Sequence, residues 1–154
     1  MSVGTMTLQR FNGEEAYAVE SATIEHYKDE EDGVYAVTFR AETGGAPIRT
    51  LPDTESLHAH PSAEVTLHLR KLPALALKPG QAFTLPKGYD DGEYQTNFYY
   101  SEHEPMDNNE VTILQRDGLR VRARLTGTTT DVNFYDGFKP DTKVVVEADF
   151  TLQL

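Results

Sequence analysis

The chain has 154 residues, of which 38% are hydrophobic and 10% aromatic, which suffices for one buried core and argues against a disordered protein. It contains no Cys, so disulfides, thiolate metal sites and thiol nucleophiles are excluded. The formal net charge of −11 disfavours nucleic acid as a partner, because binding phosphate requires Lys and Arg.

No membrane or export segment is visible in the sequence. The N-terminal stretch MSVGTMTLQRFNGEEAY lacks a basic head followed by an apolar run, and the longest mostly apolar stretch, LPALAL at 72–77, is too short to cross a bilayer. We therefore expect a cytoplasmic protein with no membrane partner. A protein exported with its leader removed would give the same pattern.

Apolar and polar side chains alternate along most of the chain, which is typical of strands with one face on a core and one in water. The second candidate strand, at 15–27, changes phase, because Tyr17 and Val19 have one parity while Ala22 and Ile24 have the other. This predicts a bulge near Glu20 and Ser21. In chain order the candidate strands are 6–11, 15–27, 34–42, 63–71, 81–85, 93–101, 110–115, 118–126 and 144–154.

Turn sequences such as KDEEDG, LKPGQ and QRDG separate these stretches at short intervals. About nine short strands with such breaks predict an all-β fold, a single antiparallel β-sandwich domain of jelly-roll type spanning residues 1–154. A closed β-barrel is the alternative. The longest irregular segment is expected at 43–62, where Thr50 and Asp53 could begin a helix of at most two turns that Pro61 would end.

The last two strands can be paired from their charges. If partner numbers sum to 269, Arg122 faces Glu147 and Arg120 faces Asp149 on one surface, while apolar pairs meet on the other. In the alternative, the strand continues through TTTDVNFY and turns at DGFKPD. The first register is favoured because it satisfies both faces, and it makes the arginines a charge ladder rather than a site for an anion.

Two stretches contain possible metal ligands. In DVNFYDG, residues Asp131, Asn133 and Asp136 are spaced somewhat like a calcium loop, but the closing Glu is missing and a turn is favoured. His58 and His60 would project to one side of an extended chain and could share a zinc ion, but a third ligand is not apparent. No cofactor is expected, and a metal ion stays an unsupported alternative.

An aromatic and acidic segment is the best candidate for binding. Residues 88–115 contain seven acids and no Lys or Arg. Within this segment Tyr99 should be exposed beside Asn97 and Gln95, where a flat ring and amide groups could hold a sugar.

The function favoured by these patterns is a non-enzymatic binding or interaction module with a protein or carbohydrate partner. No Gly-rich phosphate loop or nucleophile elbow is present, which disfavours an enzyme. A barrel that carries a small apolar ligand, and a metal-dependent or carboxylate-based hydrolase, are the alternatives. Association with a second copy through strand edges is plausible on the same pattern.

Overall fold

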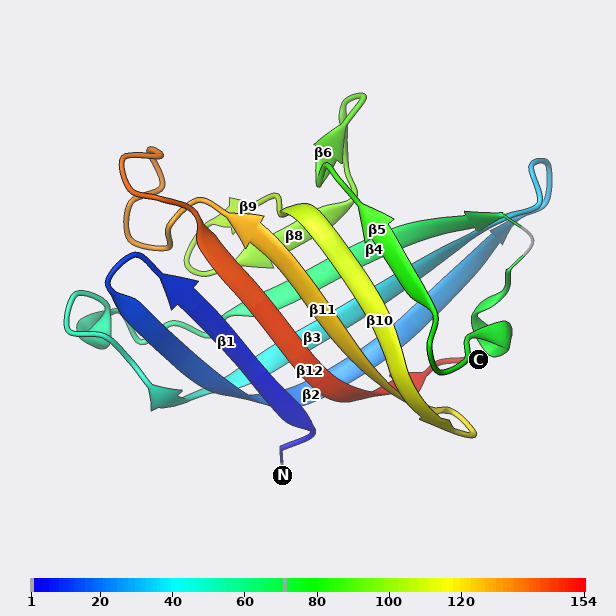
Figure 1. Cartoon of the computed structure of the whole chain (residues 1–154), viewed down its shortest axis with the longest axis horizontal. Coiled ribbons are helices and arrows are strands. Elements are labelled where there is room, and N and C mark those ends of the chain that lie inside the picture. The colour runs from blue at the N-terminus through cyan, green and yellow to red at the C-terminus, as the bar shows by residue number, and fades with distance from the viewer. Residues whose placement is uncertain (1, 71) are drawn as a thin grey trace.

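The computed structural model describes residues 2–70 and 72–154, and β-strands make up most of it. Ten strands form one sheet in the order β5-β10-β11-β12-β1-β2-β3-β4-β8-β9, and β6 and β7 form a separate hairpin (Figure 1). The strands are β1 (Gly4–Arg10), β2 (Gly13–Asp29), β3 (Val34–Arg49), β4 (Ser62–Arg70), β5 (Ala82–Leu85), β6 (Tyr89–Asp90), β7 (Glu93–Tyr94), β8 (Thr96–Tyr99), β9 (His103–Glu104), β10 (Asp107–Asp117), β11 (Arg120–Thr129) and β12 (Thr142–Leu152), and the two 3₁₀ helices are η1 (Glu55–Leu57) and η2 (Ala74–Ala76).

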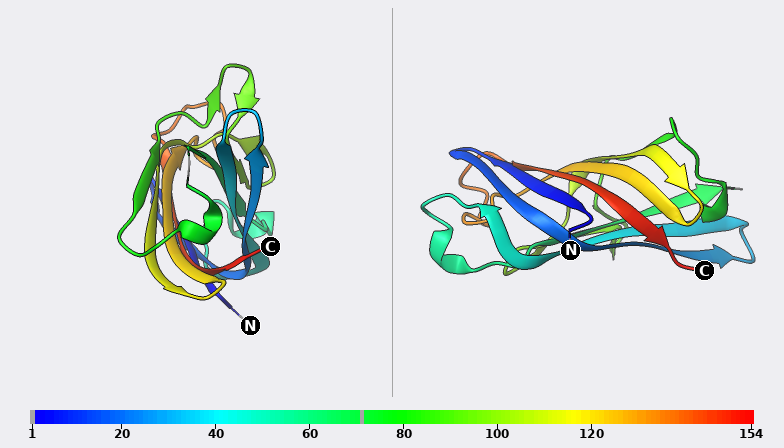
Figure 2. Two further views of the ribbon diagram at one scale, coloured as in Figure 1. Left: turned by 90° about the vertical axis from the view of Figure 1, so that its right-hand side faces the viewer. Right: turned by 90° about the horizontal axis from the view of Figure 1, so that it is seen from below.

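The large sheet bends over on itself into two layers (Figure 2). One layer holds β5, β10, β11, β12 and β1, the other holds β3, β4, β8 and β9, and β2 passes from the first into the second. β1 pairs with residues 13–19 of β2, and the unbroken pairing with β3 covers residues 21–29. The register shifts between Val19 and Ser21, which confirms the predicted bulge. A bulge bends and twists a strand, and this one lies where β2 passes from one layer into the other.

The sheet remains open, since the outer strands β5 and β9 do not pair with each other. The predicted all-β, antiparallel, sandwich-like fold is confirmed, and the alternative of a closed barrel is not adopted. Twelve strands replace the nine expected, because β6, β7 and β9 contain two residues each and are too short to give a pattern. In the part of the chain that the structure describes, no helix has the length and apolarity needed to cross a bilayer.

The core lies between the layers and is built from the inward parity of each strand. Phe39 of β3 and Phe150 of β12 meet across it edge to face, with ring centroids 5.4 Å apart, and both side chains are fully buried. Val121 and Val146, predicted to be buried, are both inaccessible to solvent. The expected core position of Leu119 is wrong, because it lies in the turn between β10 and β11 and is 41% exposed.

The short strand β1 lies between β12 and β2, and it is antiparallel to both. Beyond its first residue, Gly4, its two neighbours approach each other and pair in parallel at Leu152 and Ile24. A Cβ atom on Gly4 would overlap the backbone of Glu147 and Ala148 in β12. A residue without a side chain is therefore required where the three strands converge.

The predicted register of β11 and β12 is wrong by two positions. Partner numbers sum to 271, so that Arg122 faces Asp149 and Arg124 faces Glu147. A shift of two leaves every side chain on its predicted face, which is why the burial pattern is unaffected. Extra cross-strand pairs at Thr128 and Thr129 extend the ladder and fix this register.

The irregular segment is shorter than expected, because β3 continues to Arg49. The remaining residues, 50–61, contain only η1, and its N-cap Thr54 makes no side-chain capping bond. The predicted capping pair of Thr50 and Asp53 does not form, since Asp53 binds Arg10 instead.

Candidate functional site

Arg10 is the centre of a buried charge cluster at one end of the molecule. Its side chain is fully buried, and all five of its guanidinium N–H groups donate to carboxylates. Asp131 accepts two of these bonds, both of 2.9 Å, Asp53 accepts two of 2.9 and 2.7 Å, and Glu15 accepts one of 3.2 Å. We call these four residues the arginine hub. One cation thus faces three acidic side chains.

Two tyrosines form the other hydrogen bonds to Glu15 inside the core. The hydroxyl groups of Tyr17 and Tyr100 lie 2.9 and 3.0 Å from Glu15 Oε1, and 3.1 Å from each other. Burial raises the pKa of both phenols, and the Glu15 charge raises it further. Tyr135 donates to the carbonyl oxygen of Tyr100 and fixes the chain beside it.

The electrostatics of the arginine hub favour its charged form. Burial alone would lower the pKa of Arg10, but the hydrogen bonds and charges of Asp131 and Asp53 more than offset this and raise it. The hydrogen bonds from Arg10 in turn hold the pKa of Asp53 well below its usual range, against the opposing effect of partial burial. Every donor of Arg10 is used, so its guanidinium offers nothing to a ligand.

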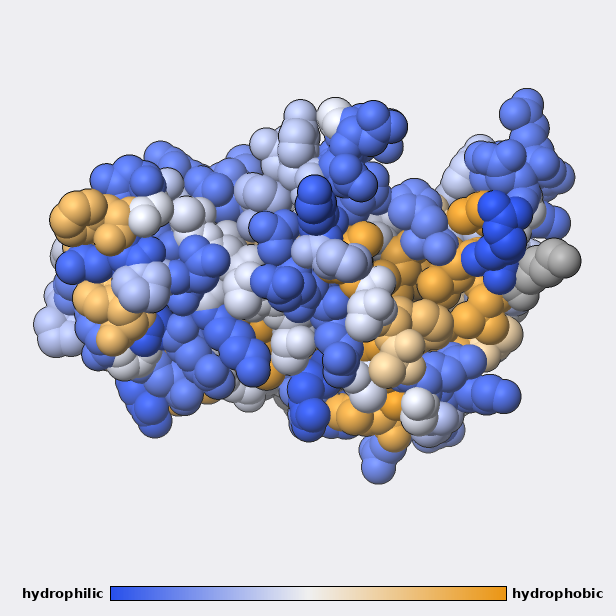
Figure 3. Space-filling view, turned by 45° about the horizontal axis from the view of Figure 1, so that its top comes forward, coloured by the Kyte–Doolittle hydropathy of each residue, from blue (hydrophilic) through white to orange (hydrophobic). Residues whose placement is uncertain are grey.

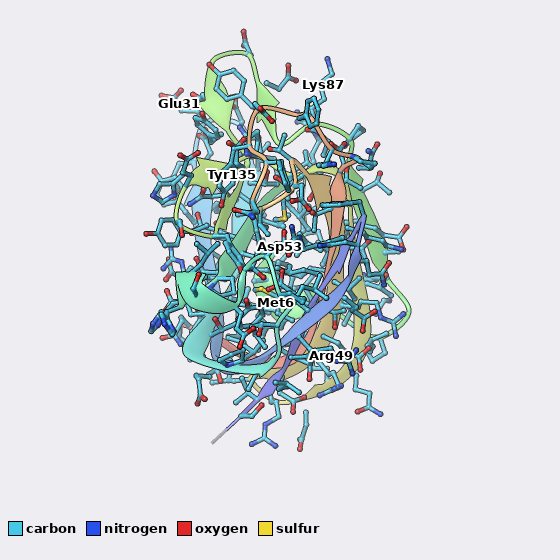
Figure 4. The ribbon with its side chains drawn as sticks, turned by 90° about the vertical axis from the view of Figure 1, so that its left-hand side faces the viewer. Met6, Glu31, Arg49, Asp53, Lys87 and Tyr135 are labelled. Atoms are coloured by element: carbon cyan, nitrogen blue, oxygen red, sulfur yellow. The ribbon has the colours of Figure 1, made fainter. Side chains whose placement is uncertain are left out.

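The hub ties together three segments that are distant in sequence. Arg10 and Glu15 come from the β1–β2 hairpin, Asp53 from the irregular segment, and Asp131 from the loop after β11. Figure 4 looks onto this end of the molecule, with Asp53 and Tyr135 near the middle of the view and Lys87 at the top beside the β6–β7 hairpin. We therefore assign the hub a structural role.

The residues proposed for calcium lie in turns of the loop after β11. Both oxygens of Asp131 are bound by Arg10, and Thr142 and the backbone N–H of Asn133 add bonds of 2.9 and 3.2 Å. The amide of Asn133 donates to the carbonyl oxygen of Asp53 over 3.1 Å. Asp136 is exposed and accepts from the backbone N–H of Phe138. Asp131 and Asn133 therefore bond to residues of the arginine hub, whereas Asp136 bonds within its own turn.

The two histidines proposed for zinc lie in the irregular segment. His58 ends η1 with a positive φ of 49° and lines a partly enclosed pocket of about 210 Å³ together with Tyr17 and Glu55. The His60 ring packs against Gly45, where a Cβ atom would overlap it. Within residues 2–70 and 72–154, no group of three or more His, Asp or Glu is gathered in a way that could hold a metal ion.

The β6–β7 hairpin projects beyond the sheet (Figure 1). It exposes two aromatic rings. Asp91 and Gly92 form its tight turn with φ values of 51° and 80°, as a two-residue hairpin with Asp-Gly requires. Tyr89 and Tyr94 pair across it, with ring centroids 4.7 Å apart, and they remain 49% and 63% exposed.

The residues proposed for a sugar lie beside this hairpin on the outer surface of β8. Tyr99 is 36% exposed, as expected, and its ring packs on His103 at 4.8 Å. The Asn97 amide lies within hydrogen-bond distance of His103 Nδ1, at 2.9 and 3.1 Å, and Gln95 Oε1 lies 2.6 Å from His68 Nε2. Both amides therefore already have an imidazole partner.

Two open clefts flank the hairpin. The first has a volume of about 510 Å³ and lies between His68 of β4 and Leu85 of β5, and its other lining residues are Pro86, Lys87, Asp90, Asp91, Glu93 and Gln95. The second has a volume of about 390 Å³ and is lined by Glu64, Tyr94, Asn97 and His103. We call the exposed side chains of the hairpin and of these two clefts, together with Tyr99, the hairpin face.

Arg120 and Arg122 of β11 line a further open cleft of about 450 Å³, together with Asp149, but two of the three β11 arginines are held in ion pairs. Arg122 contacts Glu147 at 3.0 Å and Asp149 at 3.3 Å, and Arg124 contacts Glu147 at 2.8 Å. The hydrogen bonds from Arg124 and Arg122 lower the pKa of Glu147. These ion pairs agree with the predicted charge ladder, although its members are paired in a different register.

Comparison with models of protein families, with curated proteins and with solved structures finds no match to this chain. The candidate site therefore depends on geometry alone. Sequence reasoning singled out the hairpin segment and missed the arginine hub. The signal for the hub was parity, because Arg10 shares the inward parity of Met6 and Leu8, and Glu15 shares that of Tyr17 and Val19.

Proposed function

We propose that this protein is a non-enzymatic binding module whose hairpin face takes up a positively charged segment of a partner protein. The observation that carries the proposal is the exposure of Tyr89, Tyr94 and Tyr99 within a segment that contains seven acids and no Lys or Arg, residues 88–115. Tyrosine is enriched in protein interfaces, where its ring gives contact area and its hydroxyl a hydrogen bond.

The chemistry of the hairpin face suits a cation. Asp90, Asp91 and Glu93 line the first cleft, where Lys87 is the one Lys or Arg. In the second cleft Glu64 lies beside Tyr94 and is paired with Arg40 at 3.0 Å. An exposed aromatic face attracts Lys and Arg, and neighbouring carboxylates add electrostatic steering of the encounter. A partner rich in Lys or Arg is therefore favoured.

A protein partner is preferred over a carbohydrate because of the amides. A sugar would need the amide groups of Gln95 and Asn97, and both are bonded to histidines in the free protein. The clefts that reach the 300–1,000 Å³ of typical small-molecule pockets, at about 510, 450 and 390 Å³, are open to solvent, and the more enclosed pocket beside His58 has only about 210 Å³. This makes a carrier of small ligands a weaker candidate.

The test uses defined probes and a charge-matched control. We would titrate the ¹⁵N-labelled protein with ten-residue peptides that alternate Lys or Arg with apolar residues, with acidic peptides of the same length, and with neutral oligosaccharides. We expect amide shifts at the hairpin face with the basic peptides, and weaker binding as salt is raised.

Two triple variants remove the same charge from different places. One neutralises Asp90, Asp91 and Glu93 in the hairpin face. The other neutralises three exposed acids at 30–32, in the tip of the β2–β3 hairpin, which line neither of the two clefts. We expect only the first variant to weaken binding. Equal losses in both variants, or binding of the oligosaccharides alone, would overturn the proposal.

A further inference from the structure

One side of strand β4 is only half occupied. Along the other side β3 pairs with the whole strand from Ser62 to Arg70, whereas β8 pairs with Ser62–Val65 only. The last backbone bond on the β8 side joins the N–H of Thr66 to the carbonyl oxygen of Gln95, after which the chain leaves for the β6–β7 hairpin. Among the described residues, no strand covers this edge from Leu67 to Arg70.

The free edge presents unpaired backbone groups. Backbone groups of an antiparallel strand point alternately to its two sides, so His68 and Arg70 turn their N–H and C=O groups the same way as Thr66. A second free edge faces this one, because His68 of β4 and Leu85 of β5 line the same cleft of about 510 Å³. β5 is paired with β10 alone, so its outer side is also unoccupied by any strand that the structure describes.

Partly buried apolar side chains lie next to both edges. Leu69 and Leu72 on one side and Phe83 and Leu85 on the other are only partly buried, and they pack against the main core. Figure 3 shows an apolar, hollowed surface in this half of the molecule. A strand laid here would place every second side chain on this surface, since successive side chains point to opposite faces.

The outer rim of the cleft is acidic. The cleft is lined by three acids, Asp90, Asp91 and Glu93, and by one lysine, Lys87. The outward-facing residues of an added strand would therefore meet a net negative charge. A second copy of this chain, with its formal net charge of −11, is electrostatically disfavoured as the source of that strand. The complementary segment alternates apolar residues with Lys or Arg.

We propose that the partner contributes an extended segment of this kind, which adds as a β-strand to the free edge of β4 between Leu67 and Arg70 and fills the gap to β5. Addition of a strand to a sheet edge uses backbone hydrogen bonds for affinity and alternate side chains for specificity. This inference rests on the proposed function and gives it a binding mode.

Amide exchange and a backbone variant test the mode directly. With the basic alternating peptide bound, the amide N–H groups of His68 and Arg70 should become protected from exchange by about tenfold or more, as members of a new ladder. His68→Pro removes the outward N–H and leaves the hydrogen bonds to β3 in place, and it should weaken binding of the peptide by about tenfold. His68→Ala removes the same side chain but keeps the N–H, so it is the reference against which the loss of affinity in His68→Pro is measured.

The outcomes separate the two proposals. Binding with shifts at Tyr94 but no protection at His68 and Arg70, and with equal affinity for the Pro and Ala variants, overturns strand addition and leaves the proposed function standing. Absence of peptide binding to the wild type overturns both. The exchange measurement on the wild-type protein stands even if His68→Pro fails to fold, and a thermal melt identifies that case.

Discussion

Replacement of Arg10 by Met should strongly destabilise this protein. Met keeps a long side chain but removes the five N–H groups that bind Asp131, Asp53 and Glu15, so that the fully buried carboxylates of Asp131 and Glu15 lose the cation that binds them. Breaking a buried ion pair by removing one partner typically costs about 3–5 kcal/mol. For a domain of this size, about 2–4 °C of melting temperature per kcal/mol gives a fall of roughly 6–20 °C.

The measurement is urea unfolding followed by circular dichroism, with Arg124→Met as the matched control. Arg124 pairs with Glu147, but its side chain is 49% exposed, so its loss should cost about 0–1 kcal/mol. Adding Asp131→Asn to Arg10→Met removes one of the uncompensated charges and should recover part of the loss. If Arg10→Met and Arg124→Met have the same free energy of unfolding, the arginine hub does not stabilise the fold and the reasoning fails.

Three other predictions concern pH, packing and the hairpin face. The pKa of Asp53 is lowered in the folded state, so the ionised carboxylate adds to the free energy of unfolding at pH values above the pKa of Asp in the unfolded chain, near 4. This stabilisation should decline as the pH falls below about 4, which urea unfolding measured at a series of acidic pH values would detect. Gly4→Ala should cost about 1–3 kcal/mol by forcing β1 away from β12, and an unchanged melting temperature would contradict the overlap. Tyr94→Ala should change the free energy of unfolding by no more than about 0.5 kcal/mol, since the ring is exposed, but should weaken binding of the basic peptide. A folding defect in this variant would show that the ring is structural.

The strands could be read from the sequence because period-two alternation records which face is buried. The pattern even located the bulge in β2, since Tyr17 and Ala22 could not otherwise both point inward. The same rule cannot fix register to better than two residues, because a shift of two preserves every face. The pairing of β11 with β12 therefore came out wrong while the burial of Val121 and Val146 came out right.

Charged residues at inward positions limited the prediction of sites. Arg10 and Glu15 were passed over because Arg and Glu are rarely buried, although their parity placed them inside. Their partners Asp53 and Asp131 lie in loops, where no periodicity relates them to the strands. The exposure of Tyr99 could be predicted, but the histidine partners of Gln95 and Asn97 depend on contacts between strands that local sequence does not encode.

The place of β1 also bears on how the polypeptide acquires its structure during synthesis. Gly4 pairs with Ala148, so one edge of β1 stays unpaired until a segment 144 residues later has been made. At about 5–20 residues per second, translation of that stretch takes roughly 7–29 s. Until Thr142–Leu152 leaves the ribosome, the nascent β1–β2 hairpin has an uncovered apolar flank, and we expect transient chaperone binding to concentrate there.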